Sequence, residues 1–218
     1  MINNLDMIAR KYNTDKRSND NGATMPYHGY TNMYELLLSH KRDEYKTILE
    51  IGVAEGASHK MWYEYFPNAM IYGIDNFHGM SQQAIDTRIA HVDNERIKTF
   101  VGDQTDGEFL QSFLPDTTFD LIIDDGGHGS WQHQISFRYL FPRLKSGCYY
   151  IIEDLATCLM REFREHDDLR SSSIEWLKSI QNNVSPFSYY IPQDEHLDIC
   201  EQIGALEFVG ELALILKK

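Results

Sequence analysis

The chain has 218 residues, of which 42% are hydrophobic, enough to build the core of one α/β domain. It carries 33 acidic against 20 basic residues, a formal net charge of −13. Such a surface repels phosphate backbones and anionic lipid, which argues against nucleic-acid and membrane partners. An excess of acidic residues can also serve only to keep a protein soluble. Cys148, Cys158 and Cys200 match no metal motif, and no signal peptide or membrane span is recognisable. We therefore expect reduced, mostly buried thiols and a cytoplasmic location.

Residues 1–30 are polar and rich in turn formers. The pattern predicts a short helix, a loop in which Asn, Asp, Gly and Pro cluster over Asn19–Gly29, and a second helix over 32–44. We expect residues 1–45 to form a helical cap whose loop lies over a neighbouring site.

From residue 46 onward, short apolar runs alternate with helical stretches. The expected strands are 47–53, 70–75, 97–102, 119–124 and 149–154. The expected helices between them are 58–66, 81–93, 106–114 and 130–144. This alternation predicts a parallel sheet covered on both faces, that is, a doubly wound Rossmann-like α/β fold.

After residue 154 the regular alternation of expected strands and helices stops. Residues 155–195 form an expected insert near the substrate site, in which Ser172 and Glu175 resemble a capping box. The aromatic-rich part, Asn182–Pro192, is either a lid or an ordinary surface connection. Two apolar runs, 205–210 and 212–217, are separated so briefly that they predict a hairpin, which would end a seven-stranded sheet with an antiparallel strand.

The first expected strand ends in a glycine-containing turn, Leu49–Ser58. Its spacing differs from the G-x-G-x-x-G of dinucleotide sites, and Glu50 would repel a pyrophosphate. Both features favour a cofactor that carries positive charge, S-adenosylmethionine. Asp75 lies 23 residues after Gly52, at a strand end where an acid can accept hydrogen bonds from ribose hydroxyls. The expected cofactor contacts of the turn and of the next two strand ends are Glu50, Gly52, Val53, Gly56, Ser58, Asp75 and Asp103.

Four carboxylates follow the next two strands, at Asp124, Asp125, Glu153 and Asp154. Neighbouring parallel strands bring such residues to one edge of the sheet, where unneutralised acids repel each other. Hard oxygen ligands suit Mg²⁺. We expect Asp125, Glu153 and Asp154 to bind it, and Asp124 to face the cofactor.

His128 follows a diglycine turn three residues after Asp125. Histidine titrates near roughly pH 6.5, which suits a general base. The hypothesis is that the metal acidifies an acceptor hydroxyl, His128 removes its proton, and the oxygen attacks the sulfonium methyl group in line. His133, on the following helix, is expected to lie on the helix surface rather than to bind substrate.

Several stretches together resemble the metal-dependent sugar O-methyltransferases of natural-product pathways, such as the mycinamicin, macrocin and rhamnosyl enzymes. The resemblance covers about residues 13–154, and more loosely the terminal hairpin. It rests on these segments: Asn13–Lys16, His28–Thr31, Leu49–Val53, Met61–Trp62, Phe66–Ala69, Gly102–Gln104, Asp124–His128 and Ile152–Asp154.

The resemblance implies an S-adenosylmethionine-dependent fold, Mg²⁺ at Asp125, Glu153 and Asp154, and His128 as general base. It also implies that Tyr30 lies near the cofactor and Gln104 in the loop beside the adenine. The implied partner is a small hydroxylated, glycosidic acceptor, and a homo-oligomer is possible. Two alternatives stay open: a catechol-like diol acceptor, and a non-catalytic cofactor-binding protein or cephalosporin-hydroxylase-like relative.

Overall fold

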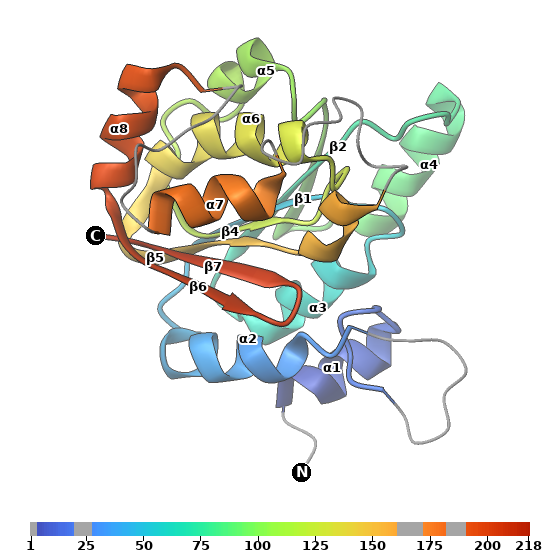
Figure 1. Cartoon of the computed structure of the whole chain (residues 1–218). Helices are drawn as coiled ribbons and strands as arrows, with labels where there is room; N and C mark the ends of the chain where they lie inside the picture. The colour runs from blue at the N-terminus through green and yellow to red at the C-terminus, as the bar shows by residue number, and fades with distance from the viewer. Residues whose placement is uncertain (1–3, 20–27, 161–171, 182–190) are drawn as a thin grey trace. The chain divides into compact units, whose positions relative to one another are not determined.

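The structure is a computed structural model that describes residues 4–19, 28–160, 172–181 and 191–218. Its strands form one seven-stranded sheet in the order β3-β2-β1-β4-β5-β7-β6 (Figure 1). Strand β4 pairs with β5 in parallel, whereas β7 is antiparallel to both β5 and β6. The doubly wound, mostly parallel Rossmann-like fold with a C-terminal antiparallel strand is therefore confirmed.

The strands form where the sequence places short apolar runs, and their buried patterns explain why. β4 and β7 are buried along most of their length, as expected for strands with neighbours on both sides. Gly210, with a φ of 60°, makes the turn between the last two strands. The strands are β1 (Thr47–Ile51), β2 (Met70–Asp75), β3 (Ile97–Val101), β4 (Phe119–Asp124), β5 (Leu144–Ile152), β6 (Ile203–Val209) and β7 (Leu212–Lys217).

The helices follow the expected alternation, with local caps at several of their ends. The side chain of Asp106 accepts hydrogen bonds from two backbone amides at the start of its helix, and Ser172 accepts one from Glu175. The α-helices are α1 (Asn4–Tyr12), α2 (Thr31–Leu38), α3 (Ala57–Tyr65), α4 (Gln82–Val92), α5 (Gly107–Ser112), α6 (Ser130–Leu140), α7 (Ser173–Gln181) and α8 (Gln193–Glu201). Short 3₁₀ turns follow at Ser39–Lys41, Phe141–Arg143 and Leu155–Leu159.

Two expected element boundaries were wrong, and one helix was missed. The helix predicted to reach residue 144 ends at Leu140, because Pro142 lacks the amide hydrogen that a continuing helix needs. β5 then begins at Leu144 rather than at Tyr149. Polar residues before Tyr149 interrupt the apolar run, and the register against β4 shifts between Phe119 and Leu121, so the apolar pattern did not show where the strand begins. Helix α8, which begins at the end of the expected insert and continues beyond it to Glu201, was not predicted at all.

The contacts divide the chain into two compact units, residues 1–48, 53–73 and 77–100, and residues 49–52, 74–76 and 101–218. In the first unit, α1 packs against α2 and α3. Asp6, almost completely buried, joins α1 to α2 and to the segment after α1. Its carboxylate accepts hydrogen bonds from the Ser18 amide (2.6 Å), the Thr31 hydroxyl (2.8 Å) and the Arg10 guanidinium (2.7 Å).

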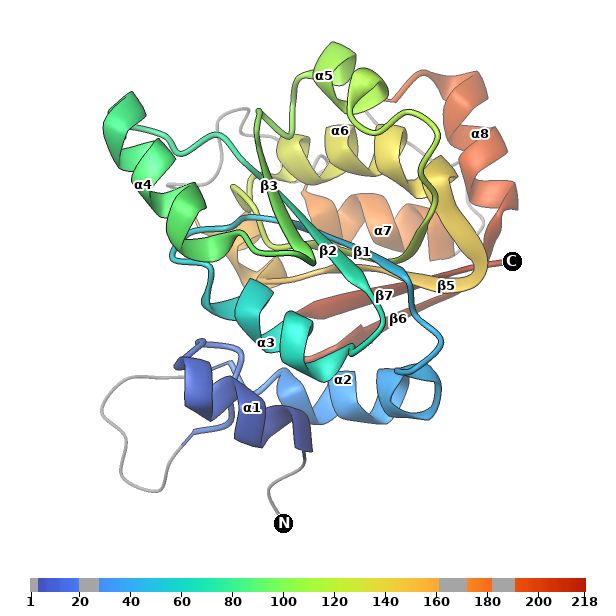
Figure 2. The same cartoon turned by 180° about the vertical axis from the view of Figure 1, so that it is seen from behind.

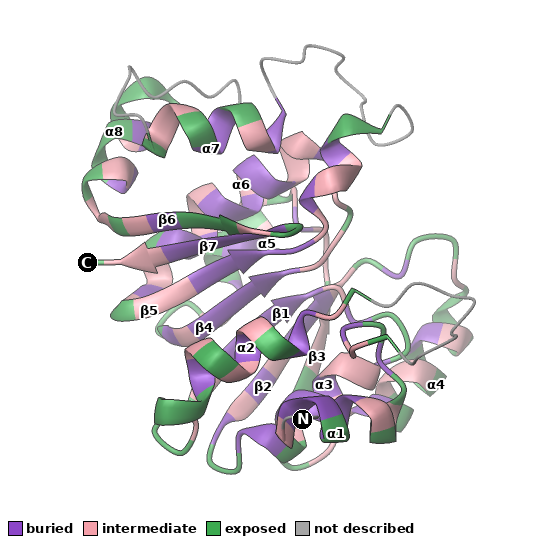
Figure 3. Ribbon diagram, turned by 60° about the horizontal axis from the view of Figure 1, so that its bottom comes forward, coloured by how far each residue is buried: buried purple, intermediate pink, exposed green. Residues whose placement is uncertain are grey.

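In the second unit, α6 and α7 lie on the same face of β4, β5 and β7 (Figures 1 and 2). Phe137 of α6 is fully buried and contacts Trp176 of α7 edge to face, with ring centroids 5.2 Å apart. Arg138 holds α8 through two hydrogen bonds to Glu195, of 2.5 and 2.7 Å. Figure 3 shows the buried residues running along β4, the end of β5, and β7.

The described residues contain no helix that is long and apolar enough to cross a bilayer. None of the three cysteines forms a disulfide, and only Cys158 is buried, so the expectation of mostly buried thiols holds for one of them. The segment Asn19–Gly29 lies mostly outside the described residues, as do 161–171 and 182–190 of the expected insert, including Phe187, Tyr189 and Tyr190. The proposed division at residue 45 stays a prediction.

Candidate active site

The two strands that carry the acidic motifs end side by side. Asp124 is the last residue of β4 and pairs with Ile152, the last residue of β5. The amide of Glu153 donates to the carbonyl oxygen of Asp124 at 3.0 Å. Asp125 and Glu153 are therefore the first residues beyond two adjacent parallel strand ends. The sequence predicted that these two ends are neighbours, although it placed Glu153 inside the strand 149–154.

Asp125 belongs to two groups of possible metal ligands among the described residues. In one, ligand atoms of Glu50, Asp125 and Glu153 lie within 4.8 Å of one another. In the other, ligand atoms of Asp125, His128 and Asp154 lie within the same distance. The other two predicted metal ligands, Glu153 and Asp154, thus each lie in a group with Asp125.

Glu50 was predicted to contact the cofactor, and its place beside two predicted metal ligands was missed. The signal was in the fold rather than in the local motif, because β1 and β4 are neighbours in the sheet. The amide of Asp125 donates to the carbonyl oxygen of Ile51 at 3.0 Å, which draws Glu50 and Asp125 to the same edge.

The chemistry of this group fits a divalent cation. Glu50 is fully buried and Glu153 is 1% exposed, while Asp125 is half-buried. Carboxylates this close repel each other strongly away from water unless a cation or protons neutralise them. Carboxylate oxygens are also the ligands that Mg²⁺ prefers.

His128 lies next to this group on an unusual backbone. Its φ is 58°, in the left-handed region that residues other than glycine rarely adopt. Nε2 of His128 lies 3.7 Å from a carboxylate oxygen of Asp154, which is itself left-handed with a φ of 54°. The side chains are 21% and 16% exposed, so both remain accessible to solvent or a small ligand.

The turn that carries His128 is held from inside the unit by Gln104. Its side-chain oxygen accepts a hydrogen bond from the Gly127 amide at 2.7 Å, and its amide nitrogen donates to Asp124 at 3.2 Å. Gln104 is 6% exposed. The expected contact of Gln104 with the cofactor stays a prediction, while the structure gives this side chain an internal role.

Asp124 is also engaged inside the protein. Besides Gln104, its carboxylate accepts hydrogen bonds from the hydroxyls of Tyr150 (3.0 Å) and Ser136. Burial raises the pKa of Asp124 to about 6, although the hydrogen bonds oppose this rise. Both oxygens have donors within the unit, so these contacts do not support the expectation that Asp124 faces the cofactor.

Three further candidates lie at strand ends of the same unit. The amide of Gly102 donates to the carbonyl oxygen of Asp75 at 3.0 Å, and the Asp75 side chain is half-exposed. Burial opposes ionisation of Asp103, but hydrogen bonds from Thr105 and Asn76 outweigh it and lower the pKa of this carboxyl. Gly52, with a φ of 94°, passes directly against the backbone of Asp125.

The remaining cofactor candidates lie in the first unit. Val53 and Tyr30 are buried, and the Tyr30 ring lies 4.9 Å from the ring of His28. Gly56 precedes α3 with a φ of 75°, against the side chain of Val92. Ser58 is half-buried in the first turn of α3.

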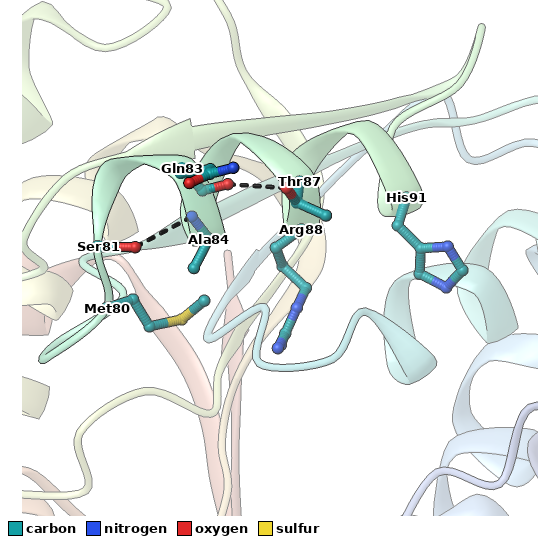
Figure 4. A pocket seen from close by; sticks show the side chains of 7 residues that line it. All are labelled: Met80, Ser81, Gln83, Ala84, Thr87, Arg88 and His91. Carbon is teal, nitrogen blue, oxygen red and sulfur yellow. Dashed lines mark hydrogen bonds between the residues drawn. The ribbon is translucent and has the colours of Figure 1, made fainter.

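A cavity of about 480 Å³ lies along α4 in this unit. The guanidinium of Arg88 donates to the Ala54 carbonyl oxygen and lies 2.9 Å from the Glu55 carboxylate, so it holds the glycine-containing turn. Figure 4 shows the side chains that line the cavity. They are Met80, Ser81, Gln83, Ala84, Thr87, Arg88 and His91.

The expectation that His133 lies on a helix surface was wrong. The side chain is fully buried, and Nδ1 lies 2.8 Å from the hydroxyl of Ser173 on α7. Burial first, and then the nearby His128, lower the pKa of His133 to about 3, which keeps this imidazole neutral. His133 therefore joins α6 to α7 rather than presenting a surface group.

Comparison with known proteins identifies residues 49–155 with a family model described as a methyltransferase domain. The chain is 32% identical over 202 residues to the 8-demethyl-8-alpha-L-rhamnosyl tetracenomycin-C 2'-O-methyltransferase of Streptomyces olivaceus, covering 88% of this chain and 50% of that protein. It is 34% identical over 164 residues to the mycinamicin VI 2''-O-methyltransferase of Micromonospora griseorubida, covering 70% and 39%. The chain thus spans half or less of the length of these curated relatives.

A solved structure of the MycE methyltransferase from the mycinamycin biosynthetic pathway, in complex with Mg, S-adenosylhomocysteine (SAH) and mycinamycin VI, has the same fold. It superposes with a TM-score of 0.77 at 28% identity, over 99% of this chain and 54% of that one. The predicted resemblance is thereby confirmed. Residues 49–155 therefore form a methyltransferase domain, and the chain is similar in sequence and fold to sugar O-methyltransferases of natural-product pathways.

Proposed function

We propose that the chain transfers a methyl group from S-adenosylmethionine to a hydroxyl of a sugar or sugar-bearing natural product, with the help of Mg²⁺. The observation that carries the proposal is the position of Asp125, whose carboxylate lies within 4.8 Å of ligand atoms on both the Glu50–Glu153 side and the His128–Asp154 side. A cation site and a base are thereby brought together at one strand edge. The relatives' names supply the acceptor class.

The proposed roles follow from these positions. Asp125, Glu153 and Asp154 would bind the cation, and the buried Glu50 would add negative charge beside it. His128 would accept the proton of the acceptor hydroxyl at Nε2, and Asp154, 3.7 Å from that nitrogen, would then stabilise the protonated imidazole. The bound cation would lower the pKa of the hydroxyl, and S-adenosylmethionine would supply the methyl group.

The proposed cofactor contacts are Glu50, Gly52, Val53, Gly56, Ser58, Asp75 and Asp103, with Tyr30, Gln104 and Asp124 as further candidates.

We also propose that residues 1–45 cover the cofactor and that 155–195 lie near the acceptor. The protein would act in the cytoplasm, as a monomer or homo-oligomer, without nucleic-acid partners. Two helices of the first region, α1 and α2, pack on each other.

The direct test is methyl transfer from labelled S-adenosylmethionine by the purified protein, with Mg²⁺ or with a chelator. Glycosidic acceptors should be methylated, and turnover should stop when the cation is removed. Methylation of catechols instead would assign the diol alternative. Binding of S-adenosylmethionine without transfer to any acceptor would support the non-catalytic one.

The variant Asp125→Asn tests the division of roles, because it keeps the shape of the side chain but removes its charge. We expect it to abolish cation-dependent turnover while cofactor binding, measured by calorimetry, stays within about threefold of the parent. Asp116→Asn, at an exposed position, is the matched control and should change neither property. Equal loss of turnover and of cofactor binding in Asp125→Asn would contradict the assignment.

A further inference from the structure

The two left-handed residues of the site are joined by a side chain that no motif identified. Thr157 lies in the 3₁₀ turn that follows β5, three residues after Asp154. Its hydroxyl oxygen lies 2.6 Å from the carbonyl oxygen of Asp154 and 3.2 Å from that of His128. One hydroxyl therefore lies within hydrogen-bond distance of the backbone of both partners in the His128–Asp154 pair.

These contacts lie at two residues whose backbone conformation is unfavourable by itself. A residue other than glycine in the left-handed region costs about 1–3 kcal/mol and persists only where its surroundings hold it. Among the described residues, His128 and Asp154 have φ values of 58° and 54°. Both lie just beyond a strand end, on loops that the sheet itself no longer holds.

Other contacts fix neighbouring positions of the two loops. The amides of Gly127 and Gly129 donate to Gln104 and Gln132, respectively, which fixes the residues on either side of His128. On the second loop, the amide of Thr157 also donates to the Asp154 carbonyl oxygen at 3.0 Å. The hydroxyl of Thr157, which has a single hydrogen to share between the two carbonyl oxygens, provides a backbone link between the loops at the level of the proposed base.

We infer that Thr157 is a positioning residue for the proposed methyl transfer: its hydroxyl links the backbones of His128 and Asp154 and so sets the 3.7 Å approach of base and acid. This inference rests on the proposed function. Its physical basis is that outer contacts, which orient ligands and catalytic groups without touching substrate, commonly change affinity or turnover by about 10–100-fold when removed.

The test compares two substitutions of Thr157 that differ in the hydroxyl. Thr157→Val keeps the shape of the side chain and removes the hydroxyl, whereas Thr157→Ser keeps the hydroxyl and removes the methyl group. We expect the valine variant to lose about 10–100-fold in kcat while the KM for S-adenosylmethionine changes by less than about threefold. The serine variant should recover turnover to within about threefold of the parent. Equal turnover of the two variants would overturn the inference.

Two further measurements separate this inference from the proposed function. Mn²⁺ binding by the unmodified protein, followed by its electron paramagnetic resonance, reports the cation site alone; absence of both Mn²⁺ binding and methyl transfer would refute the proposed function. Hydrogen exchange of peptides covering 125–131 reports the link without activity. The valine variant should exchange about tenfold faster there than the serine variant, as expected where local protection falls. Equal exchange rates would refute the link whatever the protein catalyses.

Discussion

A Cβ atom placed on Gly52 would lie 2.0 Å from the carbonyl oxygen of Asp125, closer than non-bonded atoms can approach. The amide of Asp125 meanwhile donates to Ile51 at 3.0 Å. The ends of β1 and β4 therefore interlock through their backbones. Glycine is needed at position 52 by the protein itself, whatever ligand the turn binds.

We expect Gly52→Ala to destabilise the fold by more than the strain of its positive φ alone, which is about 1–2 kcal/mol. Gly79→Ala is a matched control, because Gly79 has a φ of 77° but no atom within 4 Å of its would-be Cβ. Urea unfolding should show a loss of about 1 kcal/mol for the control and at least about 2 kcal/mol more for Gly52→Ala. Equal losses would mean that the backbone of Asp125 can move aside.

His128→Ala should reduce the turnover of methyl transfer by about 10²–10⁴-fold, the usual effect of losing a general base. The binding of S-adenosylmethionine should change little, because the proposed base acts on the acceptor. His40→Ala, at an exposed position, serves as the control. Steady-state kinetics with a glycosidic acceptor measure the turnover of the variant. A near-parental rate would remove His128 from the mechanism.

Tyr150→Phe should destabilise the second unit, because it removes a donor to the buried carboxylate of Asp124, 3.0 Å away. Hydrogen bonds to charged groups contribute about 1.5–3 kcal/mol. Tyr149→Phe removes a hydroxyl from the neighbouring, half-buried position of the same strand and should cost less than about 0.5 kcal/mol. Chemical unfolding at pH 7 compares them, and similar losses would show that Asp124 does not need this donor.

Asp6 should make stability depend on pH in the acid range. Burial opposes its ionisation, but hydrogen bonds from Ser18, Arg10 and Thr31 outweigh burial and lower the pKa of Asp6 in the folded state. This contribution is fully present above the unfolded-state pKa of about 3.9 and is lost as the pH falls through the lower folded-state value.

The variant Asp6→Asn, which cannot ionise, therefore should be less stable than the parent at pH 7, and the difference should shrink below about pH 4. Urea titrations from pH 7 to pH 2 measure it, with Asp116→Asn as the exposed control. A difference that stays constant over this range would contradict the role given to the Asp6 charge.

The parts of the site that follow directly from strand ends could be predicted from the sequence. Apolar runs located β4 closely, and parallel pairing then brought the residues after β4 and β5 together, which placed Asp125 beside Glu153. The start of β5 could not be predicted in this way, because a register shift and polar residues interrupt its pattern.

Contacts between residues that are distant in the chain could not be predicted from a single sequence. Gln104 reaches Gly127 across 23 positions, and His133 turns inward to a serine 40 positions away. Neither contact follows from a local period or motif, because it depends on how the loops and helices close over the sheet. Glu50 shows the same limit, since its motif is local but its acidic neighbours follow the ends of β4 and β5.

The family match ends at residue 155, but strand β5 is completed only by the last strand of the chain. From Tyr149 to Ile152, β5 pairs with residues 213–216 of β7. A polypeptide stopped at residue 155 would leave a hydrophobic strand with a row of unpaired backbone groups, the kind of edge that recruits other chains and aggregates. Fragments cut to the boundary of the conserved domain should therefore be insoluble, and any expression of the methyltransferase domain needs the C-terminal hairpin.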